Sequence, residues 1–153
     1  MDTSQDTETP TDLLAALSGL GPLARQLNQV HTRLWHEQVH QSLTGPQFTV
    51  LSLLHTRGPM DQGTLGALAH LDKSTAAPLL DRLDQRGLVD ITRDSNDRRR
   101  KLVHVTDNGR ALATRLAPAV VAVSEQLLDP LTSEEKALFL ALLRRTVHKA
   151  QDH

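Results

Sequence analysis

The chain of 153 residues contains no cysteine, which excludes disulfide bonds, thiolate nucleophiles and thiol-based redox sensing. It is also poor in aromatic residues, with one tryptophan, two phenylalanines and no tyrosine. Its core must therefore consist mainly of leucine, valine and alanine. The sequence has no apolar run of about 18 residues and no secretory signal pattern, so we expect a cytoplasmic protein with no membrane partner.

Acidic and basic residues nearly balance, giving a formal net charge of −1, which is unusual for a DNA-binding protein. The charges are unevenly placed, however. The first 12 residues contain four acidic residues and no basic one, whereas residues 82–101 contain seven basic residues against four acidic ones. DNA phosphates respond to a local excess of cations, so this composition does not exclude a nucleic-acid partner. We expect residues 1–11 to form a disordered acidic tail.

Apolar residues recur at helical spacing toward both ends of the chain. We expect a short amphipathic helix that ends at Gly21-Pro22 and then a long helix over residues 23–39. After the middle of the chain, Thr106 predicts the start of a helix that Pro118 kinks or splits. The capping box that begins at Thr132 predicts a last helix.

Capping residues indicate three helices in the middle of the chain, over residues 44–57, 62–70 and 73–86. Thr44 begins a capping box, with a proline in the tolerated first turn. Asp61 and Asp72 can each accept a hydrogen bond from a backbone N–H of the following turn. Gly87 suits the left-handed conformation that ends the third of these helices.

Two short β-branched runs follow, Leu88–Ile91 and Leu102–Val105, and the polar segment between them must turn. The tip of this hairpin carries the motif Asp94-Ser-Asn-Asp97-Arg98-Arg99. Two short helices followed by a basic hairpin predict a winged helix-turn-helix, with one helix for the major groove and the wing for its flank. The expected fold class is mainly α with a small β wing.

We divide the chain into four parts, which are the acidic tail (1–11), N-terminal helices for dimerisation and a ligand pocket (12–45), the winged helix-turn-helix domain (46–105) and C-terminal dimerisation helices (106–153). The terminal helices are too apolar for the surface of a small monomer, so we expect a homodimer. The alternative is that they pack as an intramolecular bundle. A twofold dimer would place two recognition helices ~34–36 Å apart on a pseudo-palindrome.

Five motifs are distinctive in combination, namely Asp72-Lys73-Ser74-Thr75, Asp81-Arg82-Leu83, Arg86-Gly87-Leu88-Val89, Asp94 to Arg99, and Thr106-Asp107-Asn108-Gly109. Over about residues 23–150 the chain resembles the MarR (multiple antibiotic resistance regulator) family of bacterial repressors. The resemblance implies a dimer with interlocking terminal helices and a small aromatic ligand between its dimer and DNA lobes. It implies that Ser74 and Thr75 contact bases or phosphates. It also implies that Arg98 and Arg99 lie near the minor groove, unless one of them pairs with Asp94 to hold the turn.

The recognition helix departs from many relatives at Ala76-Ala77-Pro78, where a long polar or basic side chain is common. Pro78 has no N–H to donate to the carbonyl of Ser74. The small Ala76 and Ala77 would permit close approach to the DNA, including contact with a thymine methyl group. Base reading would then rest on few side chains, namely Lys73, Ser74, Thr75 and Arg82.

The run from Leu23 to Trp35 resembles the subgroup of the family that controls breakdown of aromatic acids such as hydroxybenzoates. His31 and Trp35 are four residues apart and share a helix face. Arg25 could bind a carboxylate in bidentate fashion. It lies roughly 120° around the helix from His31, so it must reach around or come from the other subunit. The alternative is that Arg25 is a solvated surface charge and that His31 and Trp35 are core residues.

A different class of function is raised by His36-Glu37-Gln38-Val39-His40, which matches the H-E-x-x-H pattern of zinc hydrolases. A hydrolase would need a third ligand and a cleft, and no Gly-x-x-His follows at the required spacing. The other zinc hypothesis is a metal-responsive regulator that uses His36 and His40 with a group of the partner chain. We expect no enzymatic activity and no cofactor.

These patterns together predict a ligand-responsive transcriptional regulator that binds double-stranded DNA as a homodimer. We expect a repressor that is released by a small phenolic or aromatic carboxylate effector such as a hydroxybenzoate. Activation rather than repression, and regulation without a small ligand, are the alternatives.

Overall fold

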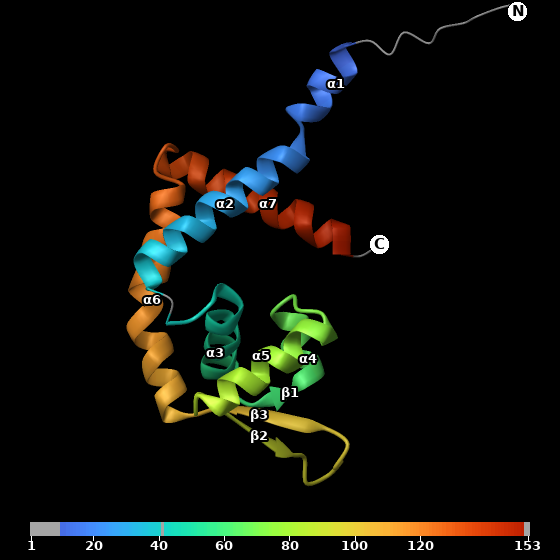
Figure 1. Cartoon of the computed structure of the whole chain (residues 1–153), viewed down its shortest axis with the longest axis vertical. Coiled ribbons are helices and arrows are strands. Elements are labelled where there is room, and N and C mark those ends of the chain that lie inside the picture. Colours follow the sequence, from blue (N-terminus) through green and yellow to red (C-terminus); the bar gives the residue numbers. More distant parts are fainter. Residues whose placement is uncertain (1–9, 41, 152–153) are drawn as a thin grey trace, which may run out of the picture. The chain divides into compact units, whose positions relative to one another are not determined.

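The computed structural model describes residues 10–40 and 42–151. The elements, in chain order, are α1 (Pro10–Leu17), α2 (Leu20–Val39), α3 (Gly45–Arg57), β1 (Met60–Asp61), α4 (Gln62–Leu68), α5 (Lys73–Gln85), β2 (Val89–Arg93), β3 (Lys101–Val105), α6 (Asp107–Leu127) and α7 (Ser133–Gln151) (Figure 1). The acidic tail expected over residues 1–11 lies outside the described residues up to residue 9, and residues 10 and 11 begin α1. No helix among those described is long and apolar enough to cross a membrane.

The chain forms two compact units. We call residues 35–122 the middle unit, and residues 1–34 together with 123–153 the terminal unit. Two long helices contribute to both units, because α2 passes from the terminal to the middle unit after residue 34 and α6 passes back after residue 122.

The middle unit contains a small antiparallel sheet with strand order β1-β3-β2. The wing strands pair from Val89 opposite Val105 to Arg93 opposite Lys101, and β1 pairs with the other edge of β3. Helices α3, α4 and α5 lie on one side of this sheet (Figure 1). A continuous core of leucine and valine side chains, including Leu51, Leu83 and Val103, fills the space between them.

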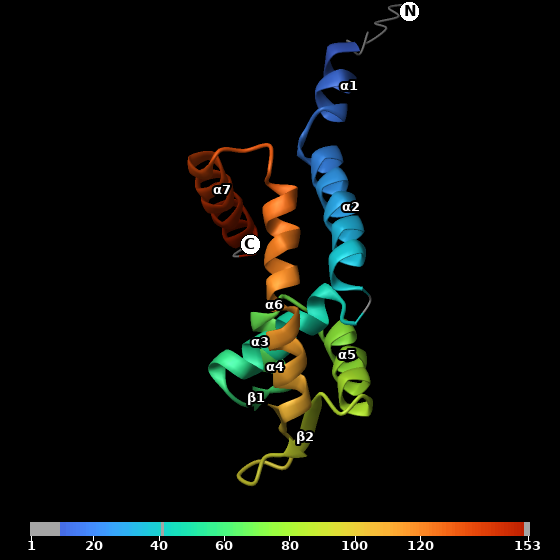
Figure 2. The same cartoon turned by 90° about the vertical axis from the view of Figure 1, so that its left-hand side faces the viewer.

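The terminal unit consists of helices, namely α1, most of α2, the end of α6 and α7, which Figure 2 shows in a second view. Three of its described hydrophobic residues are buried, namely Leu34, Val123 and Leu128. Nine large hydrophobic side chains are exposed, namely Leu13, Leu14, Leu17, Leu20, Leu23, Leu138, Leu142, Leu143 and Val147. This unit therefore leaves most of its apolar surface uncovered within one chain.

The helix ends that the capping residues predicted are confirmed. At α3, the Thr44 side chain accepts the N–H of Gln47, while the Gln47 side chain accepts the N–H of Thr44. The same reciprocal pair joins Thr132 and Glu135 at the start of α7. After α5, Gly87 has a φ of 69°, the left-handed conformation that ends the helix.

Helix α6 begins against the turn that follows α5. The Thr106 hydroxyl donates to the carbonyl of Gly87 at 2.7 Å and accepts the N–H of Gly109 at 3.1 Å. The Thr106 N–H donates to the carbonyl of Leu88 at 3.1 Å. Gly109 is buried, and a Cβ at this position would collide with the Leu88 carbonyl oxygen. The contacts of Thr106 and Gly109 therefore hold the start of α6 against the turn that follows α5.

Three details differ from the predictions. The expected break at Gly21-Pro22 lies instead at Ser18-Gly19, and α2 includes the proline in its first turn, where backbone N–H groups lack helical partners anyway. Pro118 does not split α6, which is assigned as one helix from Asp107 to Leu127. The strand β1 was not predicted, because two residues are too few to show an alternating pattern. The expected fold class, mainly α with a small β wing, is confirmed.

Candidate nucleic-acid interface and ligand pocket

The first turn of α5 presents polar side chains on a firmly capped helix end. Asp72 accepts the backbone N–H of Thr75 and the hydroxyl of Ser74, each at 2.7 Å. These hydrogen bonds, that from the Ser74 hydroxyl above all, hold the pKa of the Asp72 carboxyl below its usual value. Lys73, Ser74 and Thr75 are all exposed. The turn thus offers one cation and two hydroxyl groups to a partner.

The opposite face of α5 packs into the core of the middle unit through Ala76, Leu79, Leu80 and Leu83. The expectation that Ala76 leaves room for DNA is wrong, because it is 4% exposed and lies next to Gly66 of α4. Ala77 is half-buried, whereas Pro78 and Arg82 are exposed. Helix α5 is assigned without interruption across Pro78.

The tip of the wing is held mainly by backbone groups. Asp94 accepts the N–H of Asn96, and Asp97 accepts the N–H of Arg99, each at 3.0 Å. The side chain of Arg93 donates to the carbonyl of Arg98 at 2.8 Å. The two carboxylates therefore shape the turn through main-chain N–H groups. In the part of the chain that the structure describes, Asp94 forms no ion pair with Arg98 or Arg99, whose side chains are exposed.

The base of the wing carries an ion pair that the sequence analysis did not single out. Arg100 Nη2 lies 2.7 Å from Asp61 Oδ2, although the two residues are 39 positions apart. Asp61 also caps α4, because it accepts the N–H and the hydroxyl of Thr64 at 2.9 and 2.8 Å. The Thr64 bonds and then Arg100 hold the pKa of the Asp61 carboxyl far below its usual value, and Asp61 raises the pKa of Arg100. Sequence revealed the cap of α4 but not this distant partner.

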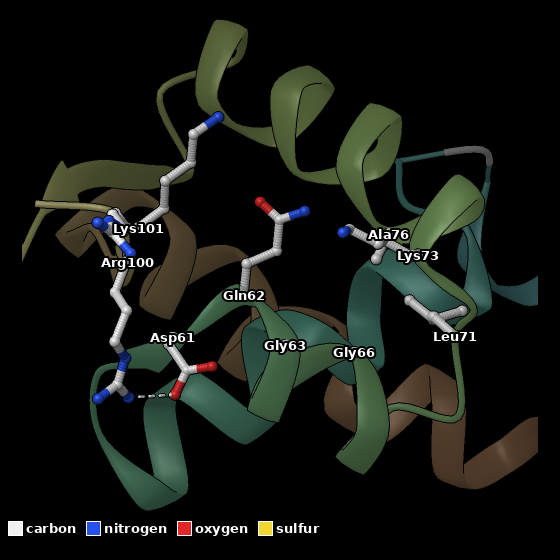
Figure 3. A pocket seen from close by; sticks show the side chains of 10 residues that line it. Asp61, Gln62, Gly63, Gly66, Leu71, Lys73, Ala76, Arg100 and Lys101 are labelled. Atoms are coloured by element: carbon white, nitrogen blue, oxygen red, sulfur yellow. Dashed lines mark hydrogen bonds and ion pairs between the residues drawn. The ribbon is translucent and has the colours of Figure 1, made fainter. Parts of the chain in front are cut away.

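A hollow of about 590 Å³ lies between the start of α4, the start of α5 and the base of the wing (Figure 3). Three cationic side chains, Lys73, Arg99 and Lys101, line it together with the Asp61–Arg100 pair. The structure therefore brings Lys73 of the expected recognition helix and Arg99 of the wing to one basic concavity. Such a surface suits a polyanion, because phosphates bind where cations and hydroxyl groups converge.

A second cavity, of about 310 Å³, lies within the terminal unit. Its walls come from α2, α6 and α7 and are mostly apolar, with Leu27, Leu127 and Phe139 among them. His31 contributes to the wall, and Asn28 and Ser124 add further polar groups. The cavity has the mixed lining of a small-molecule site, with apolar walls and a few polar side chains.

Of the three expected ligand residues, the structure places His31 at this cavity. Arg25 is exposed and is not among the side chains that line the cavity. Trp35 belongs to the middle unit, where its indole Nε1–H donates to the carbonyl of Leu43 at 2.8 Å. The Trp35 and Phe48 rings form a T-shaped pair with centroids 6.2 Å apart. These contacts give Trp35 a packing role at the end of α2.

Both zinc hypotheses require the H-E-x-x-H pattern to lie on one helix, and in the structure it does not. Helix α2 ends at Val39, and His40 follows it with a φ of 51°. Val39, which lies between His36 and His40 in the sequence, is almost completely buried. Among the described residues, no three histidine, cysteine, aspartate or glutamate side chains are grouped to hold a metal ion. His36 and His40 therefore do not share the helix face that both zinc hypotheses require.

Comparison with known proteins adds to this geometry. Residues 43–101 match the MarR family. The transcriptional repressor NicR of Pseudomonas putida is 32% identical over 140 residues, which cover 91% of this chain and 87% of NicR.

Two solved structures are similar over most of the chain. The PcaV transcriptional regulator from Streptomyces coelicolor, in complex with its natural ligand, matches with a TM-score of 0.84 and 39% identity, over 89% of this chain and 96% of PcaV. BpsR from Bordetella bronchiseptica, whose DNA binding is regulated by 6-hydroxynicotinic acid, matches with a TM-score of 0.82 and 28% identity, over 86% of this chain and 94% of BpsR.

Proposed function

The chain belongs to the MarR family of transcriptional regulators, and from this premise we propose that it is a dimeric repressor whose affinity for DNA falls when it binds a small aromatic carboxylate. The observation that carries the DNA-binding part is the basic concavity between α5 and the wing. The repressor role is supported by NicR, which is named as a repressor.

In the proposed complex, α5 enters the major groove and the wing follows the DNA backbone beside it. The first turn of α5 supplies Lys73, Ser74 and Thr75, which are exposed, and Ala77 approaches the bases from the next turn. Arg82 lies at the other end of α5 and meets a phosphate. Arg98 and Arg99 extend from the wing toward the minor groove. Phosphate contacts fix the register, whereas base contacts near the start of α5 provide sequence specificity.

The dimer rests on the apolar surface of the terminal unit. Its exposed leucine and valine side chains occupy α1, α2 and α7, and a monomer would leave all of them in water. Exposed apolar surface of this extent marks a protein interface. Association through a twofold axis would pair two α5 helices with the two halves of a pseudo-palindromic operator.

We assign the effector to the apolar cavity of the terminal unit. An aromatic ring fits its leucine and phenylalanine walls, and His31 offers a hydrogen bond to a ring substituent. Arg25 is exposed on the same helix, so we propose that it binds the carboxylate from the rim or from the other subunit. The 6-hydroxynicotinic acid that regulates BpsR belongs to this chemical class. A coupling of ~1–3 kcal/mol between the two sites would suffice for induction.

The DNA part is tested by fluorescence anisotropy with duplexes from the promoter of the protein's own gene and with a shuffled duplex of equal composition. We expect specific binding that weakens steeply as salt is raised. A chain that ignores both duplexes at low salt would refute the proposal.

The effector part is tested by titrating hydroxybenzoates and 6-hydroxynicotinic acid into the protein–DNA complex. We expect at least one acid to release the DNA, and His31→Ala and Arg25→Ala to raise the concentration needed. Arg115→Ala, which removes an exposed arginine of the middle unit, is the matched control. If Arg25→Ala leaves the response to every effective acid unchanged, Arg25 does not bind the carboxylate.

A further inference from the structure

The carboxylate of Asp61 makes two kinds of contact, because it caps α4 and also pairs with Arg100. Its Oδ1 atom accepts the backbone N–H of Thr64 and so caps α4. Its Oδ2 atom accepts both the Thr64 hydroxyl and Arg100 Nη2, at 2.8 and 2.7 Å. The cap holds the carboxylate in a fixed place relative to α4, so that Arg100 meets a charge that is already oriented.

Arg100 lies where the tip of the wing joins β3, which begins at the next residue. Asp61 is the last residue of β1 and pairs with Leu102 in the sheet. The ion pair thus adds a side-chain bond to the short β1–β3 ladder, in which β1 contributes two residues. Because β1 leads directly into α4, this bond links the base of the wing to the helix-turn-helix.

Figure 3 shows that the Arg100 side chain runs toward Asp61, while Lys101 extends in another direction. Lys73, Arg99 and Lys101 line the same hollow and have no carboxylate partner among the described ion pairs. Arg100 is therefore distinguished from its cationic neighbours by a structural bond, although it sits within the same basic segment.

We propose that the Asp61–Arg100 pair is a positioning contact that fixes the wing relative to α5, so that both residues raise DNA affinity without binding DNA themselves. This inference rests on the proposed DNA-binding function. It has an unusual consequence for Asp61, because an acidic residue beside a DNA-binding surface would otherwise lower the affinity for a polyanion.

The expected size of the effect follows from the exposure of the pair. The Arg100 side chain is 56% exposed and that of Asp61 23%, so solvent weakens their attraction. Partly exposed pairs of this kind have effects of about three- to fivefold on an equilibrium. In a dimer with two wings the losses multiply, and we expect roughly tenfold weaker operator binding.

The first test compares Asp61→Asn with Asp90→Asn. Both variants remove one negative charge from the middle unit. Asparagine at position 61 can still cap α4, so Asp61→Asn removes the charge of the ion pair and keeps the helix cap. Asp90 is an exposed residue of β2 and serves as the matched control. We expect Asp61→Asn to weaken operator binding and Asp90→Asn to leave it unchanged or slightly stronger. Tighter binding by Asp61→Asn would overturn the proposal, because Asp61 would then act only as a repelling charge.

The second test uses Arg100→Gln and the double variant Asp61→Asn/Arg100→Gln. We expect the double variant to bind no more weakly than the weaker single variant, because either change breaks the same contact. The dependence of binding on salt should keep its slope in Arg100→Gln, whereas Arg99→Ala should lower the slope by about one per wing. Additive losses together with a lower slope for Arg100→Gln would identify Arg100 as a phosphate contact and refute the proposal.

Amide hydrogen exchange of the DNA-free protein gives an independent readout. In Asp61→Asn we expect faster exchange in residues 93–102, while the core amides of α3 and α5 keep their protection. Unchanged exchange in the wing would refute the anchoring role even if DNA binding falls. If the wild-type protein fails to bind its own promoter, the proposed function itself fails, and that outcome is distinct from a failure of either variant.

Discussion

The middle and terminal units use the same aliphatic residues in opposite ways. Of the twenty buried hydrophobic residues among those described, seventeen lie in the middle unit. Of the eleven exposed large hydrophobic side chains, nine lie in the terminal unit. The middle unit thus buries most of its large apolar side chains within one chain, whereas the terminal unit leaves most of them exposed.

This difference indicates where each property of the protein originates. The middle unit holds its basic surface on a core that is complete in one chain, so its geometry is set by local packing. The terminal unit leaves most of its large apolar side chains exposed in one chain, and under the proposed function its geometry and its cavity respond to the partner subunit and the effector. A regulator needs both properties, because the DNA-binding surface must be rigid while the spacing of two such surfaces must be adjustable.

The largest effect should come from charging the apolar face of α7. We expect Leu138→Glu/Leu142→Glu to raise the dissociation constant of the dimer at least about a hundredfold, because two carboxylates without partners would be buried in an apolar interface. Analytical ultracentrifugation measures this constant. Leu68→Glu changes an exposed leucine of the middle unit and should leave the dimer intact. If the α7 variant remains dimeric, the apolar face of α7 does not form the dimer interface, and the proposed difference between the two units is wrong.

The next effect should appear in the middle unit alone. Gly109→Ala places a Cβ against the Leu88 carbonyl and 2.9 Å from Val105 Cγ2. Because these atoms belong to a packed turn and strand, we expect about 3 kcal/mol of lost stability. Thermal and urea unfolding measure it. Gly45→Ala is the control, since a Cβ there meets no atom within 4 Å. Equal stability of the two variants would mean that the start of α6 is not packed as described.

The sequence predicted the middle unit well because its signals are local. Capping residues such as Thr44 and Asp72 act within one helical turn, and the wing is bounded by two β-branched runs. The exceptions are contacts between distant residues. The Asp61–Arg100 pair joins positions 39 apart, and β1 is recognisable only from its pairing with β3. The sequence around Asp61 does not identify Arg100 as its partner, and the sequence around Arg100 does not identify Asp61.

The predictions for the terminal unit were less complete for a related reason. Helical periodicity placed His31 and Trp35 on one face, but a face does not specify which neighbours cover it. The structure places His31 at the cavity and Trp35 against Leu43 and Phe48. The roles of these two residues depend on tertiary packing, which a local pattern does not encode. Ala76 is different, because it lies three residues before Leu79 on the buried face of α5, so helical spacing alone indicates its burial.

A smaller effect should separate DNA binding from dimerisation. We expect Arg99→Ala to weaken binding by about 1 kcal/mol per wing, at every DNA sequence alike, and to reduce the salt slope by about one per wing. Anisotropy titrations at several salt concentrations measure both quantities. The dissociation constant of the dimer should not change, because Arg99 belongs to the middle unit. A loss confined to one operator base pair would assign Arg99 to base readout instead.

The smallest effect concerns the acid sensitivity of the middle unit. The pKa of Asp61 is lower in the folded chain than its ordinary value of 3.8, so its hydrogen bonds stabilise the fold fully above that value. This contribution is lost as the pH falls below about 4, because the unfolded chain then takes up the proton more readily. We therefore expect the free energy of unfolding to fall less between pH 5 and pH 3 in Asp61→Asn than in the wild type, as measured by urea titration. Asp90→Asn is the control for a general change in charge. An equal fall in the free energy of unfolding for Asp61→Asn and the wild type would show that the hydrogen bonds of Asp61 to Thr64 and Arg100 do not contribute to the stability of the middle unit.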